Sequence, residues 1–160
     1  MNNNHYWSEH DLVQIDKAIQ LSQVLEICLT VVGRMPIPVA MVSGPITTGG
    51  FDSLEKNLKV FDAVIDVLAK RGHNVFSQMP AESFMVKLWQ DWRATGQKDY
   101  CWPLLHDFYR PLFRSGKIHT MFFIPGWEKS FGASWEHDEC HKVGIQRIKL
   151  QPSFIAPLGF

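Results

Sequence analysis

The sequence predicts an α/β domain in which helices cover both faces of a parallel sheet. Short apolar runs such as "PVAMVSG" alternate with longer segments of helical periodicity such as "DSLEKNLKVFDAVIDVLAKRG". The spacings suit right-handed crossovers between parallel strands. Two glycine-rich loops, "GPITTGG" and "PGWEKSFG", directly follow strands. Because ligands bind beyond the carboxyl ends of the strands in such sheets, we expect both loops to lie together at a binding site.

The chain should begin with one long amphipathic helix. Ser8 followed by Asp11 is typical of a helix start, and apolar residues recur at helical spacing from Leu12 until Gly33 and "RMPIP" end the pattern. We therefore divide the chain into an N-terminal helix, residues 1–35, and an α/β domain, residues 36–160.

The remaining elements alternate to give a sheet of about four to five strands. After the first strand, "PVAMVSG", and a helix ended by Gly72, further strands are expected in "HNVFSQ", "IHTMFFIPG" and "IQRIKL". Helices are expected over 81–96, within "QKDYCWPLLHDFYRPLFRSGK" and in "GASWEHDECHKVG", and the tail "QPSFIAPLGF" should be irregular.

Composition narrows the class of function. The 160 residues suffice for one compact domain, and sixteen basic and sixteen acidic residues cancel, so no broad cationic surface for nucleic acid is expected. A small-molecule ligand fits better than a nucleic-acid polymer. No apolar run approaches the roughly 20 residues that span a membrane, and the start lacks a basic signal-peptide region, so we expect a soluble, cytoplasmic protein. Three cysteines without CxxC spacing argue against a disulfide framework and a zinc ribbon.

The ordered set of "VSGPIT", "AKRGHNVFSQ" and "PGWEKSFGASWEH" resembles the nucleoside 2-deoxyribosyltransferase-like superfamily, particularly its small bacterial and phage members. The resemblance covers roughly Val39 to Leu150. It implies a three-layer, flavodoxin-like sheet with an extra N-terminal helix, and chemistry at the N-glycosidic bond of a nucleoside or nucleotide, without a cofactor. Relatives often complete their sites with a neighbouring subunit. Because the N-terminal helix lies outside the family's core and must bury its apolar face, we expect a homo-oligomer.

The resemblance also implies roles for individual residues. The glutamate of the family's G-x-x-x-E pattern is the nucleophile, and the segment from Gly132 to Glu136 carries that pattern. Asp107 in "LLHDFYRPL" is the closest match to the aspartate that works on the base. Relatives have an acidic residue in or just after the third strand, where Glu128 is the available substitute. By analogy with retaining glycosidases, the two carboxyl groups should lie about 5 Å apart.

The two loops and their flanks supply the expected substrate-binding residues. Glycines allow close approach of the backbone to a sugar, and backbone amides hold a hydroxyl or phosphate. Aromatic side chains offer a stacking surface for a base. The candidates are Gly44, Pro45, Thr47, Phe51, Gly126, Trp127, Glu128, Gly132 and Trp135.

Other interpretations stay open. A glutamate in the first turn of a helix also favours the positive end of the helix dipole without catalysis, and Asp107 beside Arg110 is compatible with a surface pair. His137 and His141, with Cys140 beside them, have the spacing of metal ligands, although the segment lacks the zincin pattern. "GPITTGG" fits neither an ATP-binding loop nor a dinucleotide fingerprint. The chain is then either an N-glycosidic bond hydrolase or transferase, a non-catalytic nucleotide-binding module, or an interaction domain.

Overall fold

Four parallel strands form the central sheet in the order β2-β1-β3-β4. The computed structural model describes residues 6–46, 50 and 53–160. The strands are β1 Val39–Ser43, β2 Asn74–Val75, β3 Thr120–Phe123 and β4 Gln146–Lys149. In the register of the central pair, Ala40 is level with Thr120 and Ser43 with Phe123, so β1 and β3 end together. The sequence-based expectation of a three-layer α/β fold with a parallel sheet is confirmed.

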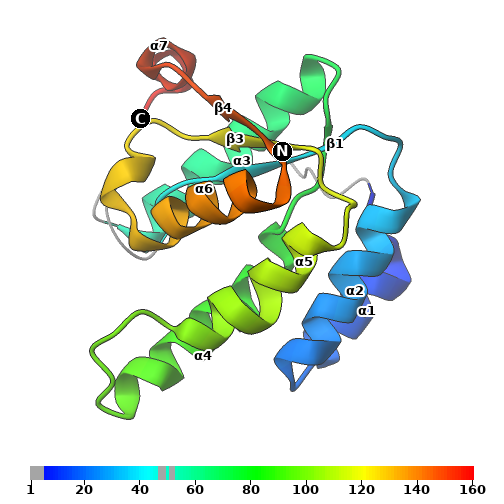
Figure 1. The fold of residues 1–160 in the computed structure, drawn as a ribbon, viewed down its shortest axis with the longest axis vertical. Coiled ribbons are helices and arrows are strands. Elements are labelled where there is room, and N and C mark those ends of the chain that lie inside the picture. Colours follow the sequence, from blue (N-terminus) through cyan, green and yellow to red (C-terminus); the bar gives the residue numbers. More distant parts are fainter. Residues whose placement is uncertain (1–5, 47–49, 51–52) are drawn as a thin grey trace.

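Helices connect the strands and cover both faces of the sheet. In the described part of the chain the α-helices are α1 Glu9–Lys17, α2 Leu21–Arg34, α3 Leu54–Lys70, α4 Glu82–Ala94, α5 Arg110–Arg114, α6 Phe131–Val143 and α7 Pro152–Ile155. Figure 1 shows α6 in front of the sheet and the fainter α3 behind it, with α1, α2 and α4 extending away from the strands.

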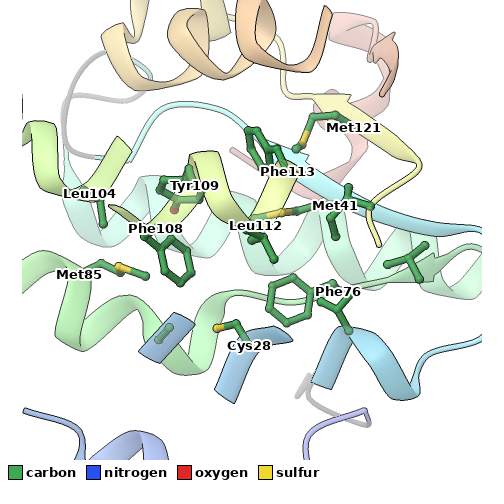
Figure 2. Packing of buried hydrophobic residues seen from close by; sticks show 14 of the residues in the cluster. Cys28, Met41, Phe76, Met85, Leu104, Phe108, Tyr109, Leu112, Phe113 and Met121 are labelled. Carbon is green, nitrogen blue, oxygen red and sulfur yellow. The ribbon is translucent and has the colours of Figure 1, made fainter. Parts of the chain in front are cut away.

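Alternation along β1 sends side chains into two separate cores. Val39 and Met41 belong to the larger core, which also receives α2, α4, α5 and α6, whereas Ala40 and Val42 belong to the smaller core under α3. Figure 2 shows part of the larger core, where Met41 of the sheet lies near Leu112 of α5. Ser43 has the same parity as Met41, so its side chain is directed to the face that α6 covers.

The single N-terminal helix expected from the sequence is wrong, because the chain breaks at residues 18–20 into α1 and α2. The side chain of Gln23 accepts hydrogen bonds from the backbone N–H groups of Ile19 and Gln20, and this cap starts a new helix. The predicted start is confirmed, since Ser8 and Asp11 form a capping box. Val24, Cys28, Val31 and Val32 of α2 are buried in the larger core of the same chain, and Leu21, Leu25, Ile27 and Leu29 pack partly buried against it.

The segment after α4 contains a π-helix, Leu104–Tyr109, that runs into α5. The N–H of Arg110 donates to the carbonyl of Leu105, five residues back, and Pro111 then offers no donor. Leu104, Leu105, Phe108 and Tyr109 are all buried, so the wide turn brings several large side chains into the core.

The tail is more regular than expected. It forms α7 and the 3₁₀ turn Ala156–Leu158, whose apolar side chains pack against the smaller core. The three cysteines are buried and free. Within the described residues, no helix combines the length and the apolar character that a membrane crossing needs.

Candidate functional site

Glu136 lies in the second turn of α6, not in its first. Ser130 caps the helix by accepting from the N–H of Ala133, and the helix begins at Phe131. The alternative in which Glu136 lies in the first turn and serves only the helix dipole is therefore wrong, because the dipole acts mainly within the first turn.

Glu136 is buried, with 8% of its surface exposed, and faces the carboxyl end of β1. The hydroxyl of Ser43, the last residue of that strand, donates to Oε2 of Glu136. Since Ser43 ends a strand buried on both faces, this contact fixes the carboxylate against the edge where the two glycine-rich loops begin. The hydrogen bond therefore places the carboxylate of Glu136 at the carboxyl edge of the sheet.

A second buried carboxyl group, that of Glu82, comes from the start of α4. Gln78 precedes this helix and donates through Nε2 to the carbonyl of Val42, which ties the segment to the end of β1. Glu82 is 5% exposed, and its Oε1 has no hydrogen-bond partner. A buried oxygen without a partner is uncommon, because desolvation of a polar group is costly.

The two glutamates line one small cavity. Its apolar wall comes from α4 and the π-helix, and Tyr100 and Tyr109 add hydroxyl groups. The lining residues are Ile46, Glu82, Met85, Val86, Trp89, Tyr100, Leu104, Tyr109, Gly132, Ala133 and Glu136. The accessible volume is about 30 Å³, room for a water molecule or two. Figure 2 shows Met85, Leu104 and Tyr109, three of these residues, on their elements.

Burial dominates the electrostatics of the pair. Desolvation, with the nearby Glu136 carboxylate, raises the pKa of Glu82 to about 8. Desolvation also raises the pKa of Glu136, to about 7, although the hydrogen bond from Ser43 opposes this shift by stabilising the charged form. The pKa of Tyr109 is raised well above its usual value by burial and by both glutamates. Of the two glutamates, Glu136 is the one whose charged form receives a hydrogen bond.

Glu139, also in α6, is a third buried glutamate of the chain, and it is paired with cations. Glu139 is 1% exposed and its carboxylate pairs with Nε of Arg110 at 3.1 Å and with Arg114 at 3.3 Å. Among the ion pairs of the described residues, neither Glu82 nor Glu136 has such a partner. Buried carboxyl groups left without cations are a feature of sites where the protein uses the proton.

An open groove of about 220 Å³ adjoins the cavity and shares Trp89 and Tyr100 with it. Arg93 and Lys98 also line the groove. Phe131, which is 49% exposed, stacks on Tyr100 with ring centroids 5.2 Å apart. The groove therefore places an exposed aromatic side chain, two cationic side chains and the acidic Asp99 next to the cavity that the glutamates line.

Larger surface hollows lie elsewhere. One, of about 380 Å³, lies between α1 and α2, and another, of about 540 Å³, lies along α3 beside Phe160. Polar and charged side chains at the surface, such as those of Gln14 and Glu55, line them. Size alone does not make these hollows better candidates, because the unpaired buried carboxyl groups line the small cavity.

Comparison of the chain with protein-family models, with curated proteins and with solved structures finds no match.

The predicted partner of Glu136 is not in the cavity. Asp107 is exposed on the π-helix, and the neighbouring Arg110 pairs with Glu139 instead. Glu128 is also exposed, in the 3₁₀ turn Trp127–Lys129. The structure thus brings Glu136 together with Glu82, and places neither of the other two acids among the residues that line the cavity.

The tryptophans predicted to stack on a base are engaged within the fold. Trp127 is buried and stacks on His137 with ring centroids 4.4 Å apart. The amino group of Lys149 lies 5.3 Å from the centroid of the Trp127 ring. Trp135 is half-buried, with the Arg110 guanidinium 5.3 Å from its ring centroid. Phe131 offers more exposed aromatic surface than either.

The three glycines predicted to bind substrate have structural roles: two allow close contacts, and one allows a left-handed backbone conformation. A Cβ on Gly132 would lie 2.6 Å from the hydroxyl of Tyr100, so this glycine lets Tyr100 sit against α6. A Cβ on Gly44 would lie 2.8 Å from Cβ of Ile124, which makes Gly44 a contact between strand ends. Gly126 has a φ of 90°, which glycine adopts without strain. Pro45 lines a separate hollow of about 10 Å³ with Ile124.

Two further predicted residues, Thr47 and Phe51, lie outside the described residues. The rival metal site has no support in the described part of the chain, where no group of three or more histidine, cysteine or acidic side chains is placed to hold an ion. Nitrogens of His137 and His141 instead lie 3.2–3.3 Å from the guanidinium of Arg147, and Cys140 is buried.

Glu82, Ser43, Tyr100 and Tyr109 were not among the residues predicted from sequence. Glu82 had one available signal: it stands near the start of a helix shortly after the second strand, and so near the carboxyl edge of the sheet. Tyr109 had none, because the π-helix that turns it into the cavity has no recognisable sequence pattern.

Proposed function

We propose that this protein binds a nucleoside or nucleotide and cleaves, or transfers at, its N-glycosidic bond, with Glu136 as the attacking carboxylate. The observation that carries the proposal is the burial of Glu136 and Glu82 without cationic partners around one cavity at the carboxyl edge of the sheet. Cleavage of a sugar–base bond through an oxocarbenium-like transition state uses one carboxylate at the anomeric carbon and a second carboxyl group as acid.

The environment of Glu136 suits an attacking group. Its hydrogen bond from Ser43 engages Oε2 and orients the carboxylate, which leaves the second oxygen for attack. Desolvation raises the pKa of Glu136 to about 7, and the apolar cavity strengthens the interaction of its carboxylate form with developing positive charge on a sugar.

The groove next to the cavity suits the rest of the substrate. The exposed face of Phe131 offers a stacking surface for a base, and Arg93 and Lys98 offer charge for a phosphate group. A sugar ring is larger than the 30 Å³ cavity, so the anomeric carbon reaches Glu136 only when a side chain at the entrance moves. Tyr100 lines both spaces and is the side chain that we expect to move.

A non-catalytic nucleotide-binding module is the second candidate. Two observations favour it: Glu136 is buried rather than open to solvent, and the cavity is small. In that case the groove holds the ligand and the glutamates are part of the core without taking part in a reaction.

We retain a homo-oligomer as part of the proposal, on new grounds. The apolar face of α2 is already buried within the chain, so it no longer calls for a second subunit. Val13 in α1 and Ile19 in the turn before α2 are 47% and 81% exposed, and they are the apolar side chains on this part of the surface that a contact between copies would cover.

The experiment is a screen of ribo- and deoxyribonucleosides and their 5′-monophosphates for released base, with and without an acceptor base. Base release that depends on protein concentration supports the proposal. If no compound releases base while calorimetry shows that a nucleotide binds, the non-catalytic module is correct. If nothing binds either, both proposals fail.

A further inference from the structure

We propose that Glu82 is the proton donor to the departing base, the role that the sequence resemblance gives to Asp107. This inference rests on the proposed function, because a proton donor has meaning only if the glycosidic bond is cleaved. It names a residue of the site that neither the loop motifs nor the G-x-x-x-E pattern contains.

Position favours Glu82 over Asp107. Glu82 and Glu136 line the same cavity, whereas Asp107 does not contribute to its lining and is exposed to solvent. A proton donor has to reach a nitrogen of the base while the nucleophile reaches the adjoining carbon, so both groups must face the same space. In the described residues, Glu82 is the acidic side chain that shares the cavity with Glu136.

The hydrogen bonds of the two glutamates separate their roles. Glu136 accepts from Ser43, which stabilises its carboxylate form. Glu82 receives no such donor at Oε1, which is fully enclosed. An enclosed carboxyl group without a donor keeps its proton more readily than a neighbour that has one, and burial together with the nearby Glu136 carboxylate raises the pKa of Glu82. The hydrogen-bond contacts of the two glutamates thus favour the protonated form of Glu82 and the ionised form of Glu136.

The reaction balances with these two groups and water or an acceptor base. An oxygen of Glu136 forms a bond to C1′ of the sugar as the bond from C1′ to the base nitrogen breaks. The electron pair of that bond goes to the base, and the carboxyl proton of Glu82 goes to a nitrogen of the base. In the second step, the Glu82 carboxylate takes a proton from water or from the acceptor base, whose oxygen or nitrogen displaces Glu136 from C1′.

The test compares two substrates that differ in their need for an acid. The base of 7-methylguanosine is already cationic and leaves without being protonated, whereas guanosine requires a proton. Both are used in the sugar and phosphate form that the wild type cleaves. If the wild type accepts only pyrimidines, the p-nitrophenyl glycoside of the same sugar replaces the methylated compound. The variants are Glu82→Gln, Glu136→Gln and Asp107→Asn, with the exposed Asp91→Asn on α4 as surface control.

We expect Glu82→Gln to slow cleavage of the unmethylated nucleoside by at least about 100-fold and cleavage of the activated one by less than about threefold. Glu136→Gln should slow both substrates alike, because it removes the nucleophile. Equal losses on both substrates in Glu82→Gln, or no loss, overturn the inference while leaving the proposed function intact. The selective pattern in Asp107→Asn instead would assign the proton to Asp107. A wild type that cleaves neither substrate refutes the proposed function itself.

A second variant keeps the test decisive if Glu82→Gln fails to fold. Glu82→Asp retains an acid but withdraws it by one methylene, so it should lose rate on the unmethylated nucleoside selectively and to a smaller extent. Equal rates of Glu82→Asp and the wild type on both substrates overturn the inference.

Discussion

Replacing Glu82 by glutamine should make the stability of the protein less sensitive to pH. The native protein holds the Glu82 proton up to a pKa of about 8, whereas an unfolded chain releases it near 4.5. Since the folded pKa is the higher one, Glu82 contributes most to stability below pH 4.5, and that contribution is lost as the pH rises towards 8. Glutamine keeps the shape of a protonated glutamate and does not titrate.

The size of this stability difference follows from how steeply the free energy of unfolding changes with pH. In the window between the two pKa values, one carboxyl group changes the free energy of unfolding by about 1.4 kcal/mol per pH unit. From pH 5 to pH 7 the wild type should therefore lose about 3 kcal/mol relative to Glu82→Gln, or about 6–12 °C in Tm for a domain of this size. With a pKa of about 8, Glu82 is mostly protonated from pH 5 to pH 7, so a neutral amide in its place changes the charge near Glu136 little over this range.

Urea or thermal unfolding followed by tryptophan fluorescence measures this difference at each pH. A difference in unfolding free energy between the two proteins that is the same at every pH reflects packing. Only the change of this difference with pH reports the Glu82 proton. Asp91→Asn, an exposed change in the same helix, should keep a constant offset. A Glu82→Gln offset that stays constant from pH 5 to pH 7 would refute the reasoning, because Glu82 would then be ionised at neutral pH and have no proton to donate.

The remaining predictions contrast the site with its structural surroundings. Glu139→Gln should lower stability at pH 7 by about 1–3 kcal/mol, since it removes the charge that pairs with Arg110 and Arg114; chemical denaturation checks this, and a variant as stable as the wild type contradicts it. Gly44→Ala should cost about 1–3 kcal/mol, because its Cβ overlaps Ile124; an unchanged Tm would show that the strand ends yield without strain.

The order of strands and helices could be predicted from the sequence because each depends on local patterns. Apolar runs bounded by Gly and Pro marked β1 and β3, and Gly144 marked the end of α6, where it has the left-handed conformation expected of a helix cap. The break between α1 and α2 escaped prediction, because apolar spacing continues across it and only the side chain of Gln23 decides the conformation there.

One part of the candidate site, Glu136, could be predicted because it too depends on a local sequence pattern. Glu136 belongs to a recognisable pattern that follows a strand, and it lies at the expected edge of the sheet. Its partner depends on long-range packing: Glu82 is 54 residues away from Glu136 in sequence, and reaches it because Gln78 ties the start of α4 to β1. Asp107 looked better placed in sequence, but the π-helix presents Tyr109 to the cavity and leaves Asp107 at the surface.

The most direct test of the account is the rate of base release by Glu136→Gln on the substrate that the screen identifies, measured beside its melting curve. Glutamine can still accept the hydrogen bond from Ser43, so the variant should fold and retain much of its ground-state binding. The account predicts a loss in turnover of at least about 100-fold, a few kcal/mol of barrier, from the missing nucleophile. A folded Glu136→Gln protein with near wild-type turnover would contradict it.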